Sequence, residues 1–596
     1  MSKTLSKRWD LDSLFKGGSS SEELKKFVHQ LHNDLSVLEE KLVAAVVPET
    51  NEQMEEWAAL LLELQGLMAR MQEAGSFAGC LTAENVHDEK AKQWQANLKP
   101  YRIRIGACMT QMEDHISEMT EETFEALLKL EALEGLTFYI REKREWTEDK
   151  LSSEQEKLAN ALAQDGYHGW GEMYNTIVSS LKIPFDENGE TKQLSAGQAQ
   201  NKLESSHRPT RVKMFEEWEK AWSSRADLFA ETLNHLSGFR LSLYEKRGWE
   251  DPLKEPLMIN RMSKDTLDAM WGAIEDMKAD LIPYMRRKAE LIGVDQLEWH
   301  DVHAPIGEIS DFISYEDGAE TISQQFAAFS PKLSTFTDMA FQKNWIEAED
   351  RENKRPGGFC TTLPVSDETR IFMTYEGTPS NLATLAHELG HAYHQYAMKG
   401  LPYFATKYAM NVAETASTFA EQIVADASIE NASSKEEEIS LLDAKLNRGL
   451  AFFMNLHSRF LFETRFYEAR KDGWLTASEI SELMVEAQKE AYCGELASYH
   501  PHFWAAKLHF HTTNVPFYNF PYTFGYLFSM GIYARAKEEG ESFENKYVAL
   551  LRDTASMSVE DLAEKHLQKD LTQQDFWKQA ARSLLNDTKR FLELTK

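Results

Sequence analysis

Cysteine is scarce in this sequence. The four cysteines, Cys80, Cys108, Cys360 and Cys493, lie far apart in 596 residues. None of them forms a Cys-x-x-Cys pair, which excludes a thiolate zinc site or a redox motif of that kind. Free cysteines at scattered positions are typical of a protein that works in a reducing compartment.

Basic residues are also in deficit. The chain has 65 lysines and arginines against 96 aspartates and glutamates, which gives a formal net charge of −31. A charge of this sign and size disfavours nucleic acid and acidic membrane surfaces as partners. Among peptides it favours cationic ones.

Long hydrophobic runs are missing as well. The first residues, MSKTLSKRWDLDSLF, contain no apolar stretch of the kind that directs export. Residues 508–534 carry no Asp, Glu, Lys or Arg, but Pro516 and Pro521 interrupt the run. We therefore expect a buried segment that lines a cavity rather than a membrane span, in a soluble cytoplasmic protein.

Helical patterns dominate what is present. Residues 20–175 show apolar residues at a near-3.6 period with few breaks, and helical patterns resume at about 197. Between them, Asn188 and Gly189 stand between short alternating runs, which predicts a β-hairpin. A loose boundary near residue 200 divides the chain into an N-terminal helical lobe (1–200) and a larger second part (201–596).

One predicted helix carries metal-binding chemistry. It runs from Thr378, an N-cap residue followed by proline, to a stop at Gly400, with the sequence TPSNLATLAHELGHAYHQYAMKG. His387 and His391 stand one turn apart on one face of this helix, so both imidazoles can bind one zinc ion. Glu388 lies roughly 100° round the helix, where a carboxylate can take a proton from a zinc-bound water.

The third zinc ligand has to come from elsewhere. A metzincin needs Gly and His at positions that hold His394 and Ala397, so that class is excluded. The alternative is a glutamate from the next predicted helix, residues 411–426, whose first turn contains Glu414. Glu421 shares the face of Glu414 and is a candidate to orient a ligand histidine. For both glutamates the competing interpretation is a solvated side chain.

Two short strands are predicted just before the histidine helix. Gly357 and Gly358 precede the β-favouring residues 359–362, and residues 370–375 form the second run. The edge of such a hairpin can pair with an extended peptide and place it over the zinc, which makes both glycines candidates for substrate binding. An ordinary structural hairpin is the alternative, and the sequence does not separate the two.

The charge-free run holds a cluster of histidine and tyrosine. His509, His511, Tyr522 and Tyr526 lie in it, and neutral imidazoles and phenol hydroxyls are suitable donors to a developing oxyanion. An aromatic core in which each hydroxyl only finds a partner explains the same residues. From the residues alone both interpretations stay open.

The segments TLAHELGHAYH, AETASTFAE and HFH…FYNFPYTFGYLFS together resemble the thimet-oligopeptidase-like zinc peptidases, most closely the oligoendopeptidase F branch. RWDLDSLF and the segment leading into GGFC resemble that branch too. The resemblance implies a mostly α-helical, two-lobed zincin of the gluzincin type, with a deep substrate channel and a small β-sheet next to the histidine helix. It also implies one zinc ion per chain and cleavage of short, unstructured peptides at internal bonds.

Residue roles follow from the same resemblance. It implies His387, His391 and Glu414 as zinc ligands, Glu388 as general base, His509 and Tyr526 as catalytic donors, and Tyr522 as a substrate contact. His511 competes with His509 for its role. The alternatives are a helical zinc carboxypeptidase with the same metal site and a non-catalytic peptide-binding protein. The base at Glu388 argues against the binding protein, since binding alone needs no base. The preferred cleavage site, the physiological substrate and the oligomeric state do not follow from the sequence.

Overall fold

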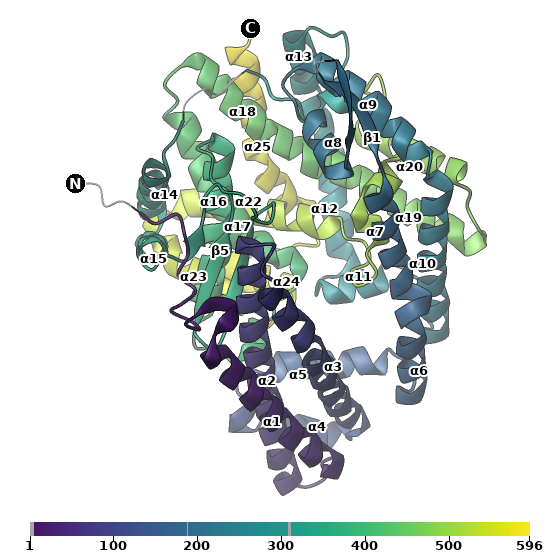
Figure 1. Cartoon of the computed structure of the whole chain (residues 1–596), viewed down its shortest axis with the longest axis vertical. Coiled ribbons are helices and arrows are strands. Elements are labelled where there is room, and N and C mark those ends of the chain that lie inside the picture. The colour runs from purple at the N-terminus through teal and green to yellow at the C-terminus, as the bar shows by residue number, and fades with distance from the viewer. Residues whose placement is uncertain (1–4, 188, 308–311) are drawn as a thin grey trace.

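The computed structural model describes residues 5–187, 189–307 and 312–596. Within these ranges the protein is built mainly of α-helices, with one two-stranded and one three-stranded sheet (Figure 1). The expectation of a mostly helical fold is therefore confirmed. None of the helices described is both long and apolar enough to cross a membrane.

The N-terminal helices form the purple and dark blue part at the bottom of Figure 1. Ser21 caps the first of them by accepting a hydrogen bond from the backbone N–H of Leu24 at 3.2 Å, as its position before an apolar periodic run predicts. The helices are α1 (Glu22–Ala44), α2 (Asn51–Glu84), α3 (Glu89–Glu118), α4 (Glu121–Leu127), α5 (Thr137–Glu148) and α6 (Ser153–Ala163).

A hairpin and a second group of helices follow. The hairpin pairs β1 (Ile183–Glu187) with β2 (Glu190–Leu194) in antiparallel register, which confirms the predicted turn, although Asn188 itself lies outside the described residues. Around it lie α7 (Gly169–Ser180), α8 (Ala196–Leu203), α9 (Arg208–Ser223), α10 (Ala226–Arg247), α11 (Lys254–Ile259), α12 (Lys264–Met277) and α13 (Ile282–Ile292).

The three-stranded sheet leads into the central helices. Its order is β3 (Ile346–Glu347), β5 (Glu368–Phe372), β4 (Phe359–Leu363), so β4 lies at an edge. The β4–β5 hairpin was predicted, whereas the two-residue strand β3, parallel to β5, was not. The flanking helices are α14 (Tyr315–Phe329), α15 (Pro331–Gln342), α16 (Pro379–Ala397) and α17 (Met410–Glu430). In Figure 1 the sheet lies between α2 and these helices.

The C-terminal helices complete the larger part of the molecule. One of them, α22, packs along α17 near the centre of Figure 1. They are α18 (Lys435–Leu450), α19 (Leu456–Asp472), α20 (Ala477–Ala491), α21 (Phe503–Ala506), α22 (Phe520–Glu539), α23 (Glu544–Asp553), α24 (Val559–Leu567) and α25 (Gln574–Leu594).

Two separate hydrophobic cores hold these helices together. The smaller core contains residues from Trp9 to Ile140, and four residues from the sheet and the segment after α16 join it. The larger core runs from Tyr174 to Phe591. The change from one core to the other therefore falls between residues 140 and 174, and the domain boundary near residue 200 stays a prediction.

Candidate active site

The N-terminus of α16 is capped as the sequence predicts. Thr378 Oγ1 accepts a hydrogen bond from the backbone N–H of Asn381 at 3.1 Å, and Asn381 Oδ1 accepts one in return from the backbone N–H of Thr378 at 3.3 Å. Pro379 occupies the first helical position, where its missing N–H costs nothing. This start fixes the helix that presents His387 and His391, whose ring centroids lie 4.8 Å apart.

Close packing of α17 against α16 brings the third candidate ligand, Glu414, next to the two histidines. A Cβ atom at Gly390 would lie 2.4 Å from the carbonyl oxygen of Ala416 and 2.6 Å from Cα of Ser417. Only glycine therefore lets the two helices approach this closely. On the other side, a Cβ at Gly525 of α22 would lie 3.0 Å from Cβ of Glu414. Gly525 thus lets α22 lie directly against Glu414, and Gly390 lets α16 lie against the backbone two residues after it.

The side chains of His387, His391 and Glu414 converge. Glu414 Oε2 lies 3.3 Å from Nε2 of His387 and 3.6 Å from Nε2 of His391, and one donor atom from each residue falls within a 4.8 Å cluster. Two imidazoles and one carboxylate are a donor set that zinc accepts with a fourth position left open. The three residues predicted as ligands therefore fit a zinc ion.

A second carboxylate fixes one of the two histidines. Nδ1 of His387 lies 3.4 Å from Oε2 of Glu421, and Glu421 pairs with Arg448 of α18. Burial acts to lower the pKa of His387, but the hydrogen bond to Glu421 and the charge of Glu414 raise it. A proton held at Nδ1 by Glu421 leaves the Nε2 lone pair for a metal. Sequence patterns had given no sign of Arg448, because it comes from a helix beyond the motif.

Burial lowers the pKa of His391 to about 4, so its ring is neutral near pH 7 and can act as a ligand. His394, the next histidine along α16, approaches Thr554 Oγ1 at 2.9 Å and stacks on Tyr408. It is held away from Glu414 in the core, and it does not belong to the donor cluster.

Glu388 has the environment of a general base. It is 7 % exposed, and its Oε2 has no hydrogen-bond partner among the described residues. Burial raises its pKa to about 7. A carboxyl group with a pKa near the working pH is well suited to accept and return a proton. A cation bound by the neighbouring ligands would lower that pKa again.

The edge strand β4 reaches the same place. A Cβ at Gly358 would lie 3.3 Å from Oε1 of Glu388, so the backbone just before β4 passes directly over the carboxylate. Gly357 has a φ of +92°, a conformation that other residues rarely adopt. Since β4 is an edge strand, its outer backbone groups are available to an extended peptide.

The aromatic cluster divides into two groups. His509 stacks on Tyr518 with centroids 5.0 Å apart and meets Tyr522 at 6.3 Å, and burial lowers its pKa to about 4. Burial raises the pKa of Tyr522, and the charges of Tyr518 and Glu414 raise it further. Glu414 is thus among the groups whose charge affects the Tyr522 hydroxyl. Tyr518 was not singled out from the sequence, although it lies in the same charge-free run.

Tyr526 points in a different direction. Its ring stacks on Phe452 at 4.2 Å, and its hydroxyl is buried without a hydrogen-bond partner among the described residues. Burial raises its pKa to about 12, with Arg448 lowering it and Glu421 raising it. The ring neighbours of Tyr526, Phe452 and Phe453, therefore differ from those of His509, which are Tyr518 and Tyr522.

His511 is a core residue. It stacks on Tyr174 with centroids 4.0 Å apart, and its Nε2 lies 3.2 Å from the carbonyl oxygen of Trp504. The short helix Leu508–His511 turns the two histidines of this segment to different surroundings, so His509 is the one that joins the tyrosines.

Family models and related sequences agree on the kind of protein that this chain resembles. The sequence model of peptidase family M3 matches residues 202–582, and that of oligopeptidase F matches residues 115–183. An oligoendopeptidase F homolog of Lactococcus lactis subsp. lactis (strain IL1403) is 22% identical over 560 residues, which cover 92% of this chain and 90% of that protein. The oligopeptidase PepF of Bacillus subtilis (strain 168) is 22% identical over 449 residues, covering 72% of this chain and 65% of that protein.

Solved structures share the fold. The crystal structure of a protein from Chlamydophila abortus superposes with a TM-score of 0.83 at 17% identity, covering 99% of this chain and 98% of that one. Oligoendopeptidase-F from Enterococcus faecium gives a TM-score of 0.70 at 18% identity, with 97% and 99% covered. The overall fold of this chain is therefore one already seen in these proteins.

Proposed function

The chain belongs to peptidase family M3, and we propose that it hydrolyses internal bonds of short peptides with one zinc ion held by His387, His391 and Glu414. It is a metallopeptidase. The observation that carries the finer proposal is the convergence of those three donor groups beside the buried carboxyl of Glu388. The names of its relatives, oligoendopeptidase and oligopeptidase, support short peptides as substrates.

Different residues of the protein carry out different steps of the proposed reaction. His387, His391 and Glu414 would hold a zinc ion, and the chemistry that it would supply there is Lewis acidity toward the scissile carbonyl and the attacking water. Glu388 takes the proton of the attacking water and delivers it to the leaving amine. Glu421 keeps His387 in the tautomer and orientation that a ligand needs. The edge of β4 aligns the peptide backbone beside Gly358.

Donors for the oxyanion come from the C-terminal aromatic residues. Buried hydroxyls normally have a partner, and the unpaired Tyr526 hydroxyl is suited to one that arrives with the substrate. His509 and Tyr522 offer further donors on the Glu414 side. We assign the catalytic role to Tyr526 and His509, and a substrate-binding role to Tyr522.

Tyr526→Phe separates catalysis from packing. Loss of one oxyanion donor is expected to lower kcat by about 10²–10³-fold. The melting temperature should stay the same or rise, because the variant removes a buried hydroxyl that has no partner in the folded protein. Steady-state kinetics and thermal unfolding measure both effects. If Tyr522→Phe lowers kcat this strongly while Tyr526→Phe does not, the donor is on the Glu414 side.

Digestion of a mixed peptide library, followed by sequencing of the products, tests the function as a whole. We expect internal cuts in short peptides, about one zinc per chain, and loss of cleavage after chelation with no loss of helical circular dichroism. Stepwise removal of C-terminal residues would indicate a carboxypeptidase instead. Full activity after complete removal of metal would contradict the proposed zinc site.

A further inference from the structure

A cavity of about 660 Å³ lies near the start of the histidine helix. Ser380, in the first turn of α16, is part of its wall, and segments from α8 to α21 supply the rest. The wall residues that bear on its chemistry are Glu204, Trp299, His303, Ser380, Arg459 and Lys507. No role in the proposed mechanism has been given to any of them.

Two of these residues are cations without an acidic partner. Among the described residues, no carboxylate makes an ion pair with Arg459 or Lys507. Arg459 donates to Oδ1 of Asn455 at 2.9 Å, and its guanidinium lies 5.2 Å from the ring centroid of Phe503. Nζ of Lys507 lies 5.3 Å from the same centroid. Two half-buried positive charges thus share one aromatic ring at the wall of a cavity.

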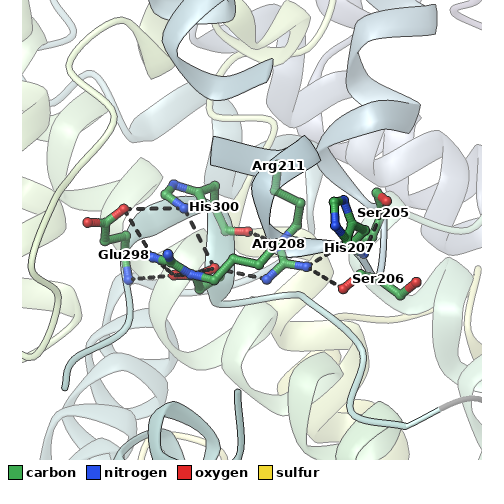
Figure 2. A network of polar contacts seen from close by, with 8 residues as sticks. Ser205, Ser206, His207, Arg208, Arg211, Glu298 and His300 are labelled. Carbon is green, nitrogen blue, oxygen red and sulfur yellow. Dashed lines mark hydrogen bonds and ion pairs between the residues drawn. The ribbon is translucent and has the colours of Figure 1, made fainter. Parts of the chain in front are cut away.

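The acidic groups on either side of the wall residues Trp299 and His300 are already paired with arginines. Asp301 binds Arg211 at 2.9 Å and Arg208 at 3.0 Å, and Glu298 lies 3.5 Å from Arg208. Figure 2 shows Arg208, Arg211, Glu298 and His300 of this network. Arg211 also donates to backbone carbonyls of residues 205, 206 and 300, which fixes it in this position. These carboxylates are therefore not free to balance Arg459 or Lys507.

The remaining nearby acids do not balance the pair either. Glu219 pairs with His500 and lies 2.7 Å from Nδ1 of His502. Glu204 is exposed, and no ion pair joins it to Lys507 in the part of the chain that the structure describes. Burial, with a smaller contribution from Arg459, lowers the pKa of Lys507 to about 8. Lys507 is still mostly charged at pH 7, and an anion in the cavity would stabilise that charge.

The cavity borders the segment that carries His509, because Lys507 lies directly before the short helix Leu508–His511. Arg459 and Lys507 both act on the pKa of His509, and Arg459 acts on that of Tyr522. Ser380 lies seven residues before His387 on α16, which corresponds to about 10.5 Å along the helix. An extended peptide advances about 3.3 Å per residue, so about three residues span that distance.

We propose that Arg459 and Lys507 form a subsite for one carboxylate of the peptide substrate, about three residues from the cleaved bond. The carboxylate is either the C-terminal one or the side chain of Asp or Glu. This inference rests on the proposed peptidase function. It adds a local preference for negative charge to a protein whose net charge of −31 repels anions overall.

Matched peptides test the subsite. One series keeps a single cleaved bond and ends three residues later with a free acid or an amide. A second series is amidated throughout and carries Glu or Gln at that third position. Hydrogen bonds to charged groups contribute about 1.5–3 kcal/mol, so we expect kcat/KM to differ by about 10–100-fold within one of the two series. The series that responds identifies the source of the carboxylate.

Variants then assign the preference to the two cations. Lys507→Gln and Arg459→Gln should each bring the ratio of charged to neutral peptide toward one, by slowing cleavage of the charged peptide more than that of the neutral one. The charge-retaining variants Lys507→Arg and Arg459→Lys should keep most of the ratio. Lys489→Gln, which removes an exposed charge away from the cavity, is the matched control and should keep all of it.

Two outcomes would overturn the subsite. In one, the wild-type enzyme treats both members of both series alike. In the other, the Gln variants lose charged and neutral peptides equally, which indicates a structural role. Fluorescence anisotropy with the same peptides, labelled, measures binding without turnover. Failure of all cleavage would count against the peptidase proposal, while the binding ratio would still decide the subsite.

Discussion

Glu388→Gln is expected to lower kcat by about 10²–10⁴-fold, because it removes the group that accepts the proton of the attacking water. The substitution is nearly isosteric, and Glu388 Oε2 has no partner among the described residues that a glutamine amide would disturb. His387, His391 and Glu414 are left in place. Zinc content and affinity for uncleaved peptide should therefore survive. Single-turnover kinetics, metal analysis and equilibrium peptide binding measure the three quantities.

Glu73→Gln is the matched control for that result. Glu73 is also buried, and burial raises its pKa as it does for Glu388. It accepts hydrogen bonds from the backbone N–H of Val365 and the hydroxyl of Ser366, away from the donor cluster. We expect cleavage by this variant at close to the normal rate. A Glu388→Gln enzyme that remained fully active would rule out Glu388 as the base and, with it, the proposed mechanism.

Helix caps and tight turns are the parts of the fold that the sequence predicts correctly. The Thr378 cap, the hairpin at Gly189 and the cap at Ser21 each depend on residues a few positions apart, and the structure confirms all three. Strand β3 was not predicted, because it has only two residues and forms through parallel pairing with β5. Its formation depends on a partner more than twenty residues away, which no local pattern reveals.

The same distinction applies to the candidate site. The spacing of His387 and His391 follows from helix geometry, and the search for a third ligand in the next helix led to Glu414. What the sequence does not show is how closely α16 and α17 approach. That depends on Gly390, whose hydrogen faces the backbone of Ala416.

The side-chain directions of the histidines and tyrosines in the charge-free run do not follow from the sequence. Tyr522 and Tyr526 do lie one turn apart on the continuous helix α22, yet their rings meet different neighbours, Tyr518 and Phe452. His509 and His511 both lie in the short 3-10 helix Leu508–His511, and their side chains meet different neighbours. Side-chain direction in such a segment is decided by the core that surrounds it, and only the three-dimensional packing supplies that information.

The cation pair at the cavity could not be found from sequence either. Arg459 and Lys507 are 48 positions apart, and each reads as an ordinary charged residue next to apolar ones. Their significance comes from the absence of a carboxylate partner among the described residues, since Asp301 is paired with arginines and Glu219 with histidines. A missing partner is a property of the tertiary structure alone.

Glu414→Ala is expected to abolish most zinc binding and, with it, cleavage. The carboxylate is the only acidic member of the donor cluster, and its loss leaves two neutral imidazoles to hold a dication. Loss of groups that only orient a ligand typically costs 10–100-fold in metal affinity or activity, so loss of a ligand should exceed that range. Competition with a chelator of known zinc affinity measures the difference, and circular dichroism checks that the helices remain.

Glu421→Ala provides the comparison that identifies the ligand. Glu421 lies 3.4 Å from Nδ1 of His387, on the side of the ring that faces away from Glu414, and it is paired with Arg448. Its removal loosens the ring but leaves the three donor atoms in place, so zinc affinity should fall by about 10–100-fold and no more. Tighter zinc binding by Glu414→Ala than by Glu421→Ala would show that Glu421 is the ligand. In that case His387 would bind the metal through Nδ1, because that is the nitrogen that Glu421 approaches.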